Sequence, residues 1–315
     1  MRQFTSVEIC AGAGGQALGL ELAGFRHLAL VEIEVVACET LLLNRPQWNV
    51  VNIDVREFKG QPYVGVDLLS GGVPCPPFSV AGMQLGQKDE RDLFPEAVRL
   101  AAECQPKAIL LENVKGILQS KFDTYRETLN KDFENLGYRG EWKLLNASDF
   151  GVPQLRPRAV FVAFKNNWYD TFEWPQSTTT PPTVADVLYE EMNSAGWEAV
   201  DEWAERAREI APTLVGGSKK HGGPDLGPTR AKRAWAELGV DGHGIAYEPP
   251  KNGFVGKPKL TVQMAALIQG FPSNWVFAGK KTPAYRQVGN AFPPPVAKQV
   301  GLAIRRNLER YLSEY

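Results

Sequence analysis

One cysteine of this sequence stands where covalent chemistry is commonly found. Cys75 lies in the Gly/Pro-rich stretch SGGVPCPPFS, directly after the apolar run VDLL. In an open α/β sheet, ligands bind beyond the carboxyl ends of the strands, so this loop is placed where a reaction can occur. Many intracellular cysteines are small buried hydrophobes, but a Gly/Pro-rich loop is not an apolar stripe. The pattern therefore favours Cys75 as a nucleophile, which requires partial exposure and a nearby positive charge or dipole.

Two further clusters of charged residues adjoin apolar runs. Glu112 ends the run in LLENV, where it could hold a ligand or simply cap the following segment. Arg156 and Arg158 stand in QLRPR, just before the apolar run AVFVAF. Arginines beside a buried strand are costly unless they pair or bind an anion or a carbonyl. These side chains are candidate partners of Cys75.

A glycine cluster near the N-terminus suggests a nucleotide-like ligand. The stretch EICAGAGG ends one apolar run and opens a helical one, so its backbone can approach a ligand at a helix N-terminus. A plain tight turn and a Rossmann dinucleotide site are alternatives, although the spacing is not G-x-G-x-x-G. Glu32 and Asp54 follow the next two predicted strands. Two carboxylates at successive strand ends beside a glycine loop favour a nucleoside ligand.

Alternating strand and helix patterns predict the elements that must position these residues. Apolar runs predict strands at 5–10, 27–32, 66–72, 107–113 and 159–164, with a short strand near 50–53. Helical spacing predicts helices at 15–24, 35–44 and 91–105. We expect an α/β fold with a mostly parallel sheet and helices on both faces.

The character of the chain changes near Trp168. A Pro/Thr-rich break is followed by a predicted helix around 197–210 and a Gly/Pro/Lys-rich stretch, 213–235, with no clear period. Apolar helical spacing returns at 296–312. We predict a first domain at 1–170, a smaller second domain at 171–271, and a return to the first domain at 272–315.

Composition sets limits on the class of protein. The 315 residues are 43% hydrophobic and 23% charged, as in soluble globular proteins. The chain shows neither a signal pattern nor a long apolar run, so we expect a cytosolic protein that contacts no membrane. Four scattered cysteines without a C-x-x-C pair predict no metal site. A net charge of −1 argues mildly against nucleic acid, yet 213–259 holds eight Lys or Arg against four Asp or Glu.

These clusters, in this order, resemble the bacterial cytosine-5 DNA methyltransferases. AGAGG with LGLELAG resembles the family's cofactor loop, and PCPPFS resembles its nucleophile loop. ENV, Q-x-R-x-R, ALIQGFP and QVGNAFPPPVAKQV resemble four further motifs, so that the likeness covers nearly everything outside 171–256. The resemblance implies a Rossmann-like S-adenosylmethionine-dependent fold with a target-recognition domain. It also implies an enzyme that methylates carbon 5 of cytosine in double-stranded DNA.

The resemblance implies a role for each cluster. Cys75 would attack carbon 6 of a flipped-out cytosine, Glu112 would hold N3 and the amine, and Arg158 with Arg156 would bind the O2 side and the loop. S-adenosylmethionine would contact Cys10, Ala11, Gly12, Ala13, Gly14, Gly15, Glu32, Ile33, Asp54, Val55, Pro74, Leu93 and Asn290. DNA would contact Ser79, Gln154, Lys219, Lys220, Arg230 and Arg233.

Two departures from the family pattern and three rival functions remain. The family usually has Phe where Cys10 stands, and an Arg-Glu pair where this chain reads Val262-Gln263-Met264. The rivals are a transfer-RNA methyltransferase, whose Cys-Phe-Thr stretch is absent here, a catalytically inactive cofactor-binding regulator, and a nicotinamide dehydrogenase. We expect a monomer, and a restriction endonuclease acting separately is a candidate partner. The recognised DNA sequence does not follow from these residues.

Overall fold

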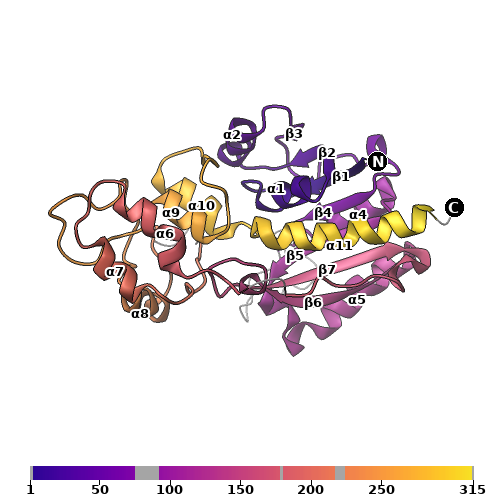
Figure 1. The fold of residues 1–315 in the computed structure, drawn as a ribbon. Helices are drawn as coiled ribbons and strands as arrows, with labels where there is room; N and C mark the ends of the chain where they lie inside the picture. The colour runs from indigo at the N-terminus through magenta and orange to yellow at the C-terminus, as the bar shows by residue number, and fades with distance from the viewer. Residues whose placement is uncertain (1–2, 75–91, 178–179, 217–223, 314–315) are drawn as a thin grey trace.

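The larger of two lobes is built on one β-sheet (Figure 1). The structure, a computed structural model, describes residues 3–74, 92–177, 180–216 and 224–313. Within these residues the sheet has seven strands in the order β3-β2-β1-β4-β5-β7-β6. The strands are β1 (Phe4–Ile9), β2 (Phe25–Val31), β3 (Val50–Val51), β4 (Leu68–Gly71), β5 (Ala108–Val114), β6 (Tyr138–Asn146) and β7 (Pro157–Lys165).

The sheet is parallel from β3 to β5 and antiparallel beyond it. β1 pairs in parallel with β2 and β4, and β4 pairs in parallel with β5. β7 runs antiparallel to both β5 and β6. The prediction of a mostly parallel sheet is therefore confirmed. β6 was not expected, because this edge strand is only partly buried and its sequence YRGEWKLLN lacks a continuous apolar run.

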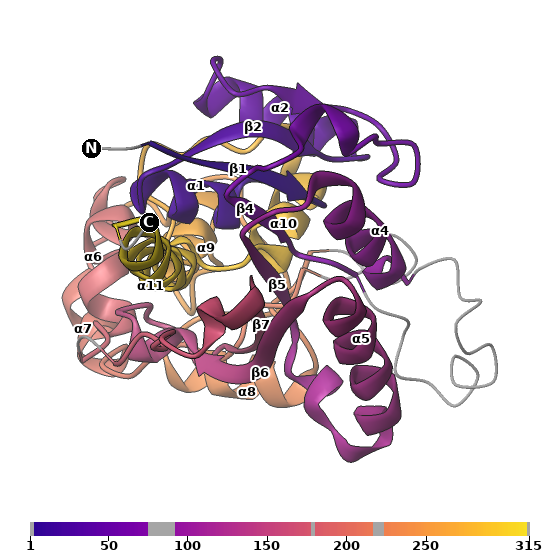
Figure 2. The same cartoon turned by 90° about the vertical axis from the view of Figure 1, so that its right-hand side faces the viewer.

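Helices cover both faces of the sheet, as predicted (Figure 2). Successive strand residues point to opposite faces, so Leu110 packs toward α1 and α11 while Leu111 packs toward α4 and α5. The helices of this lobe are α1 (Gly15–Leu22), α2 (Val35–Asn44), α4 (Phe94–Cys104), α5 (Asp123–Asn135) and α11 (Pro294–Ser313). Short 3₁₀ helices lie at Gln61–Tyr63, Lys115–Leu118, Ser120–Phe122, Ala147–Asp149 and Asn166–Tyr169.

The C-terminal helix returns to the start of the chain. A Cβ on Gly19 of α1 would lie 2.4 Å from the Cβ of Ala297 in α11, so the two helices touch where only glycine fits. This close approach locks α11 along the face that α1 covers. α11, which covers the apolar segment 296–312, therefore packs beside α1 on the sheet lobe.

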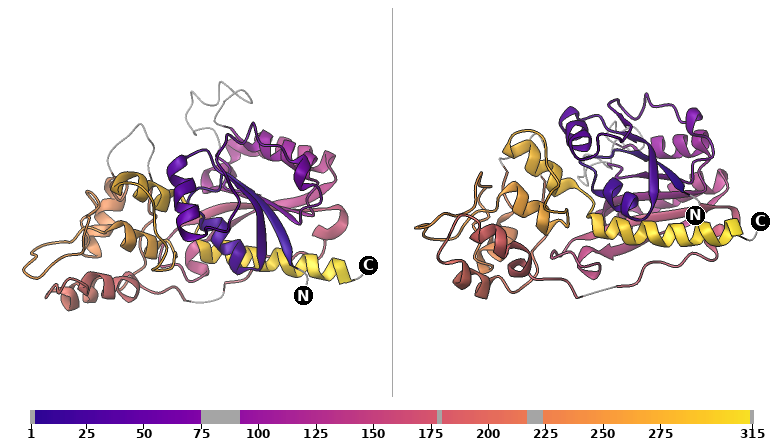
Figure 3. Two further views of the ribbon diagram at one scale, coloured as in Figure 1. Left: turned by 90° about the horizontal axis from the view of Figure 1, so that it is seen from above. Right: turned by 45° about the horizontal axis from the view of Figure 1, so that its top comes forward.

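The smaller lobe is helical (Figure 3). It contains α6 (Val184–Asn193), α7 (Val200–Arg206), α8 (Thr229–Glu237), α9 (Val262–Ile268) and α10 (Lys281–Asn290). Trp197, Trp203 and Trp235 are buried in its core. The expected helix at 197–210 is shorter than predicted. The stretch 213–235, which shows no clear period in the sequence, nevertheless contributes most of α8, a highly charged helix that buries Trp235.

The domain boundaries stay a prediction. In the structure α10 packs against α9 in the helical lobe, whereas α11 packs against α1 in the sheet lobe (Figure 1). None of the described helices is both long and apolar enough to span a membrane.

Candidate active site

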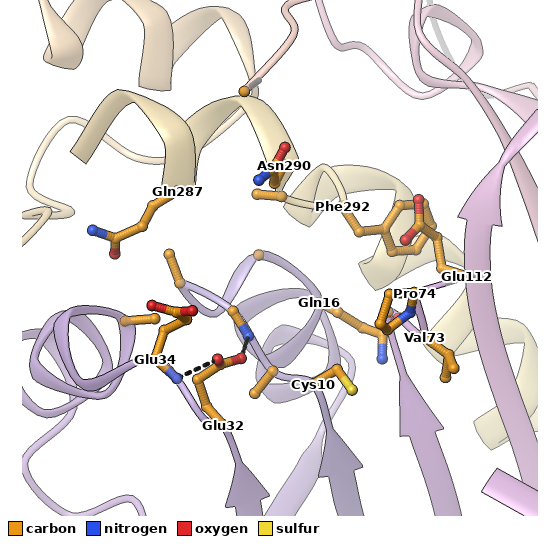
Figure 4. Close-up of a pocket in the computed structure, with 18 of the residues that line it drawn as sticks. Cys10, Gln16, Glu32, Glu34, Val73, Pro74, Glu112, Gln287, Asn290 and Phe292 are labelled. Carbon is orange, nitrogen blue, oxygen red and sulfur yellow. Dashed lines mark hydrogen bonds between the residues drawn. The ribbon is translucent and has the colours of Figure 1, made fainter. Parts of the chain in front are cut away.

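A cavity of about 870 Å³ opens at the carboxyl ends of the central strands. Figure 4 shows Cys10 and Glu32 on the side of β1 and β2, Glu112 at the other end, and Asn290 entering from α10. Twelve of the thirteen predicted cofactor contacts line this cavity, namely Cys10, Ala11, Gly12, Ala13, Gly15, Glu32, Ile33, Asp54, Val55, Pro74, Leu93 and Asn290. Glu112 and Arg158 line the same cavity. One space therefore joins the two groups of predicted site residues.

The glycine loop turns sharply between β1 and α1. Gly12 and Gly14 have φ of +55° and +85°, a region that side chains disfavour. A Cβ on Gly15 would lie 2.2 Å from the carbonyl oxygen of Phe292, so the loop is pressed against the chain that follows α10. Gly14 is the N-cap of α1 and does not line the cavity. Gly14 therefore serves the turn, and the structure does not place it at the cavity where a cofactor contact was expected.

Cys10 lies at the cavity floor with an unfavourable φ of +52°. Burial, together with the nearby carboxylates of Glu32 and Asp54, raises the pKa of its thiol well above the usual range. Burial also raises the pKa of Cys38 and of Cys104 to about 11. The cysteines in the described part of the chain are thus protonated near neutral pH, which makes them poor nucleophiles.

Glu32 is held by backbone N–H groups on both of its oxygens. The N–H of Gly12 donates to Oε2 at 2.7 Å, and the N–H of Glu34 donates to Oε1 at 2.8 Å (Figure 4). Burial raises the pKa of this carboxyl, and these hydrogen bonds oppose the rise. Asp54 is fixed by Arg56, whose backbone N–H and Nη1 donate to its two oxygens. Both carboxylates, which line the cavity, are therefore fixed by hydrogen bonds from neighbouring residues.

Glu112 and Arg158 form a buried ion pair at the other end of the cavity. The two residues lie on the adjacent antiparallel strands β5 and β7, and Nε of Arg158 lies 2.7 Å from Oε1 of Glu112. Burial raises the pKa of Glu112, while Arg158 opposes the rise. A Cβ on Gly72 would lie 3.5 Å from Oε2 of Glu112, so the carboxyl stands beside the loop that leads to Cys75.

Asn113 connects this pair to the same loop. Its Nδ2 donates to the carbonyl of Val73 at 2.7 Å, two residues before Cys75. The motif ENV contained this residue, but sequence reasoning assigned it no role. Cys75 and Ser79 themselves lie outside the described residues, as do Lys219 and Lys220.

Two predicted contacts with substrate or DNA are internal. Gln154 and Arg156 are completely buried, and neither lines the cavity. Arg156 donates to the carbonyls of Leu214, Gly289 and Ala291, and Gln154 bonds to Leu214 and Gln269. The expectation that Arg156 is catalytic and that Gln154 touches DNA does not fit these positions, because their polar atoms are directed at other parts of the protein.

The helical lobe presents two of the predicted DNA contacts. Arg230 and Arg233 are exposed on α8, whereas the neighbouring Lys232 forms an ion pair with Asp225. Sequence reasoning missed a further part of the cavity wall, which comprises residues 213–216, Arg286, Gln287 and Phe292. Gln287 and Phe292 stand in the motif QVGNAFPPPVAKQV, so a signal existed for them. The stretch 213–216 carries no motif.

No group of three or more His, Cys, Asp or Glu side chains is arranged to hold a metal within the described ranges. The model for "C-5 cytosine-specific DNA methylase" matches residues 4–306. The chain belongs to the C-5 cytosine-specific DNA methylase family. On this fold, residues of the motifs AGAGG, ENV and QVGNAFPPPVAKQV line one cavity, together with Arg158.

Curated members of the family resemble the whole chain. Type II methyltransferase M.NgoMIV of Neisseria gonorrhoeae is 56% identical over 312 residues, which cover 98% of this chain and 99% of that protein. M.NaeI of Lentzea aerocolonigenes is 54% identical, covering 98% of this chain and 76% of that protein. M.Eco47II of Escherichia coli is 36% identical, with 98% and 80% covered.

Solved structures share the fold at low identity. A prophage-encoded DNA modification methyltransferase from E. coli superposes with a TM-score of 0.69 at 22% identity, over 97% of this chain and 99% of that one. DNMT2 of Spodoptera frugiperda gives 0.68 at 17% identity, over 96% and 99%. These likenesses establish the same mixed α/β methyltransferase fold.

Proposed function

We propose that this protein is a DNA (cytosine-5-)-methyltransferase that transfers a methyl group from S-adenosylmethionine to carbon 5 of cytosine within a specific double-stranded sequence. The observation that carries the proposal is the shared cavity. Glu32 and Asp54 line one end of it, and the Glu112–Arg158 pair lines the other. A nucleoside-containing cofactor and a planar base can therefore be held in one enclosed space.

The residues present fit S-adenosylmethionine. The glycine loop offers close backbone approach, and Glu32 and Asp54 offer carboxylates for hydroxyl and amine groups. Ile33 and Val55 supply apolar lining, and Pro74, Leu93 and Asn290 complete the enclosure. When bound, the cofactor supplies an electrophilic methyl group.

The Glu112–Arg158 pair suits recognition of a cytosine ring. A carboxyl whose pKa is raised by burial can carry a proton and donate it toward N3, while its other oxygen accepts from the exocyclic amine. The guanidinium of Arg158 can donate to O2. Because the cavity is buried at this end, the base must leave the duplex to reach it.

The proposed reaction follows a covalent route through Cys75. The thiolate sulfur would form a bond to carbon 6, which shifts the C5=C6 pair to C4–C5 and the C4=N3 pair to N3, where it takes the proton of Glu112. Carbon 5 would then take the methyl group that the cofactor supplies, with S-adenosylhomocysteine as the leaving group. Loss of the C5 proton to solvent would restore the C5=C6 bond and release the thiolate, and N3 would return its proton to Glu112. Asn113 supports this route, since it holds Val73 at the start of the loop that carries Cys75.

The helical lobe is proposed to select the sequence. Exposed Arg230 and Arg233 suit contacts with phosphate, and Lys219, Lys220 and Ser79 are proposed contacts outside the described residues. Since the similar curated proteins are named type II methyltransferases, we propose that the protein is the modification half of a restriction-modification system, with a separate endonuclease and a monomeric form.

A labelling experiment tests the proposal. Purified protein is incubated with methyl-tritiated S-adenosylmethionine and either plasmid DNA or total RNA, and host DNA is sequenced after bisulfite treatment with and without the gene. We expect label in DNA and protected cytosines at one recurring sequence. Label in RNA alone would establish the transfer-RNA alternative, and cofactor binding without transfer to either would establish an inactive regulator.

A further inference from the structure

The chain between α7 and α8 of the helical lobe also forms part of the cavity wall. Residues 213–216 line the cavity beside Asn290 and Phe292. The side chain of Leu214 is buried in an apolar cluster that joins both lobes, and the neighbouring Val215 lies 3.5 Å from a Cβ built on Gly227 of the helical lobe. One short stretch thus touches both the cavity and the lobe that is proposed to read DNA.

Two buried side chains fix the backbone of Leu214 on both sides. Its N–H donates to Oε1 of Gln154 at 2.9 Å, and its carbonyl accepts from Nη1 of Arg156 at 2.7 Å. Both side chains come from the segment between the strands of the sheet lobe, and both are completely buried. The stretch 213–216 is therefore fixed to the sheet lobe through the backbone of Leu214, and it contacts the helical lobe through Val215.

The same guanidinium reaches the end of α10. Nη2 of Arg156 donates to the carbonyls of Gly289 at 2.7 Å and Ala291 at 3.0 Å, the residues on either side of Asn290. Gln269 adds a third bond to this region, since its Nε2 donates to Ala291 while its Oε1 accepts from Gln154. The backbone around Asn290 and the backbone of Leu214 thus share one donor group.

Two glycines allow these stretches to touch. A Cβ on Gly289 would lie 2.4 Å from the Cα of Gly216, and a Cβ on Gly216 would lie 2.3 Å from Oδ1 of Asn290. Neither position has room for a side chain. The stretch 213–216 is therefore held flat against the wall that carries Asn290.

We propose that Arg156 is a positioning residue that couples the cofactor cavity to the helical lobe, by holding 213–216 and 289–291 as one unit. This inference rests on the proposed function. Leaving a buried donor without an acceptor costs more free energy than the hydrogen bond itself contributes. Arg156 therefore keeps the three carbonyls in fixed positions relative to one another. A ligand that fixes the position of Asn290 then also fixes the position of Leu214. Because coupling is reciprocal, DNA bound by the helical lobe strengthens cofactor binding by the same factor by which the cofactor strengthens DNA binding.

Binding measurements on the full chain test this coupling. S-adenosylhomocysteine is the probe. Its affinity for the protein is measured by calorimetry with and without a duplex that carries the sequence that the enzyme methylates. Arg156→Lys keeps the charge but cannot reach three carbonyls, so we expect its affinity for the probe to fall at least ~10-fold, the effect of losing a charged hydrogen bond. We also expect the ratio of the probe's affinities with and without the duplex to shrink. KM for the cofactor should change more than kcat.

A second variant and a control separate positioning from general stability. Gly216→Ala forces a Cβ into Oδ1 of Asn290 while Arg156 stays intact, and it should reduce the same ratio. Arg305→Lys removes an arginine that donates to the carbonyl of Ala23, far from the cavity, and should leave the ratio at its wild-type value.

The outcomes distinguish this inference from the proposed function. If wild-type protein does not bind S-adenosylhomocysteine, the proposed function fails. If it binds and methylates, but folded Arg156→Lys keeps the wild-type affinity and ratio, the coupling role is overturned. Should Arg156→Lys not fold, an unchanged ratio in Gly216→Ala overturns the role equally, as would a wild-type ratio that shows no coupling.

Discussion

Arg158 and Glu112 join two antiparallel strands at the deep end of the cavity, with Nε and Oε1 2.7 Å apart. Both residues are buried, so the two charges of the pair have little contact with water. Breaking such a pair leaves one charge buried without compensation. The pair is therefore both a candidate catalytic unit and a structural connection, and variants must be interpreted with both in mind.

Replacing Glu112 by Gln should reduce turnover by at least ~10²-fold, the usual scale for a positioned proton donor. Because Glu112 is one partner of a buried ion pair, we also predict a loss of roughly 3 kcal/mol in the free energy of unfolding, typical of removing one partner. Turnover normalised to bound S-adenosylhomocysteine, with thermal unfolding in parallel, checks both effects. Normal turnover per folded molecule would leave Glu112 with a purely structural role.

Cys75→Ser should abolish methylation while cofactor binding stays close to that of the wild type. In the same assay, DNA with 5-fluorocytosine at the target should form a denaturant-stable adduct with wild-type protein and cofactor. Fluorine cannot leave as a cation, so elimination is blocked. Electrophoresis under denaturing conditions detects the adduct. Its absence on a sequence that the enzyme methylates would contradict the covalent mechanism.

Gly15→Ala should weaken cofactor binding, because its Cβ would lie 2.2 Å from the carbonyl of Phe292 and displace the loop. Gly19→Ala is the matched control on the same helix. It clashes with Ala297 but does not line the cavity, so it should reduce stability more than affinity. Calorimetric titration and thermal unfolding separate the two effects. Equal losses of affinity in both variants would show that the clash acts only through stability.

Glu8 should make stability depend on pH. Burial raises the pKa of this carboxyl from 4.5 to about 8, and Gln16 and Ser70 oppose the rise only in part. The folded state therefore holds a proton that the unfolded state loses, and the stability of wild type should fall between pH 4.5 and about 8. One proton corresponds to about 1.4 kcal/mol per pH unit. Glu8→Gln should remove this slope in denaturant titrations, and an unchanged slope would contradict the assignment.

Exchange of residues 178–256 for the matching region of a relative with another target should change the methylated sequence. Base-edge contacts discriminate by ~1–3 kcal/mol each, so a few readers in this region can decide the target. Bisulfite sequencing of plasmid DNA identifies the target. An active chimera that keeps the original sequence would place specificity in the sheet lobe and overturn the predicted domain division.

Patterns in the chain were sufficient for the parallel strands and for most of the cavity. β1, β2, β4 and β5 follow predicted apolar runs, and parallel strands bring their carboxyl ends to one edge. That rule alone predicted that Glu32 and Glu112 lie at the same edge of the sheet, where both line the cavity. β6 and α8 were not predicted, because each has a polar exposed face and few apolar residues.

The motifs were sufficient to identify the family, the sheet edge at which the candidate site lies and the charged groups near it. Which of those groups face the cavity depends on how distant segments of the chain pack together. Arg156 and Arg158 are two residues apart, yet Arg158 pairs with Glu112 whereas Arg156 bonds to Leu214, Gly289 and Ala291. The reason is physical. A guanidinium is satisfied by any set of acceptors, and those of Arg156 are backbone carbonyls from segments 58 to 135 residues away, which carry no signal in local spacing.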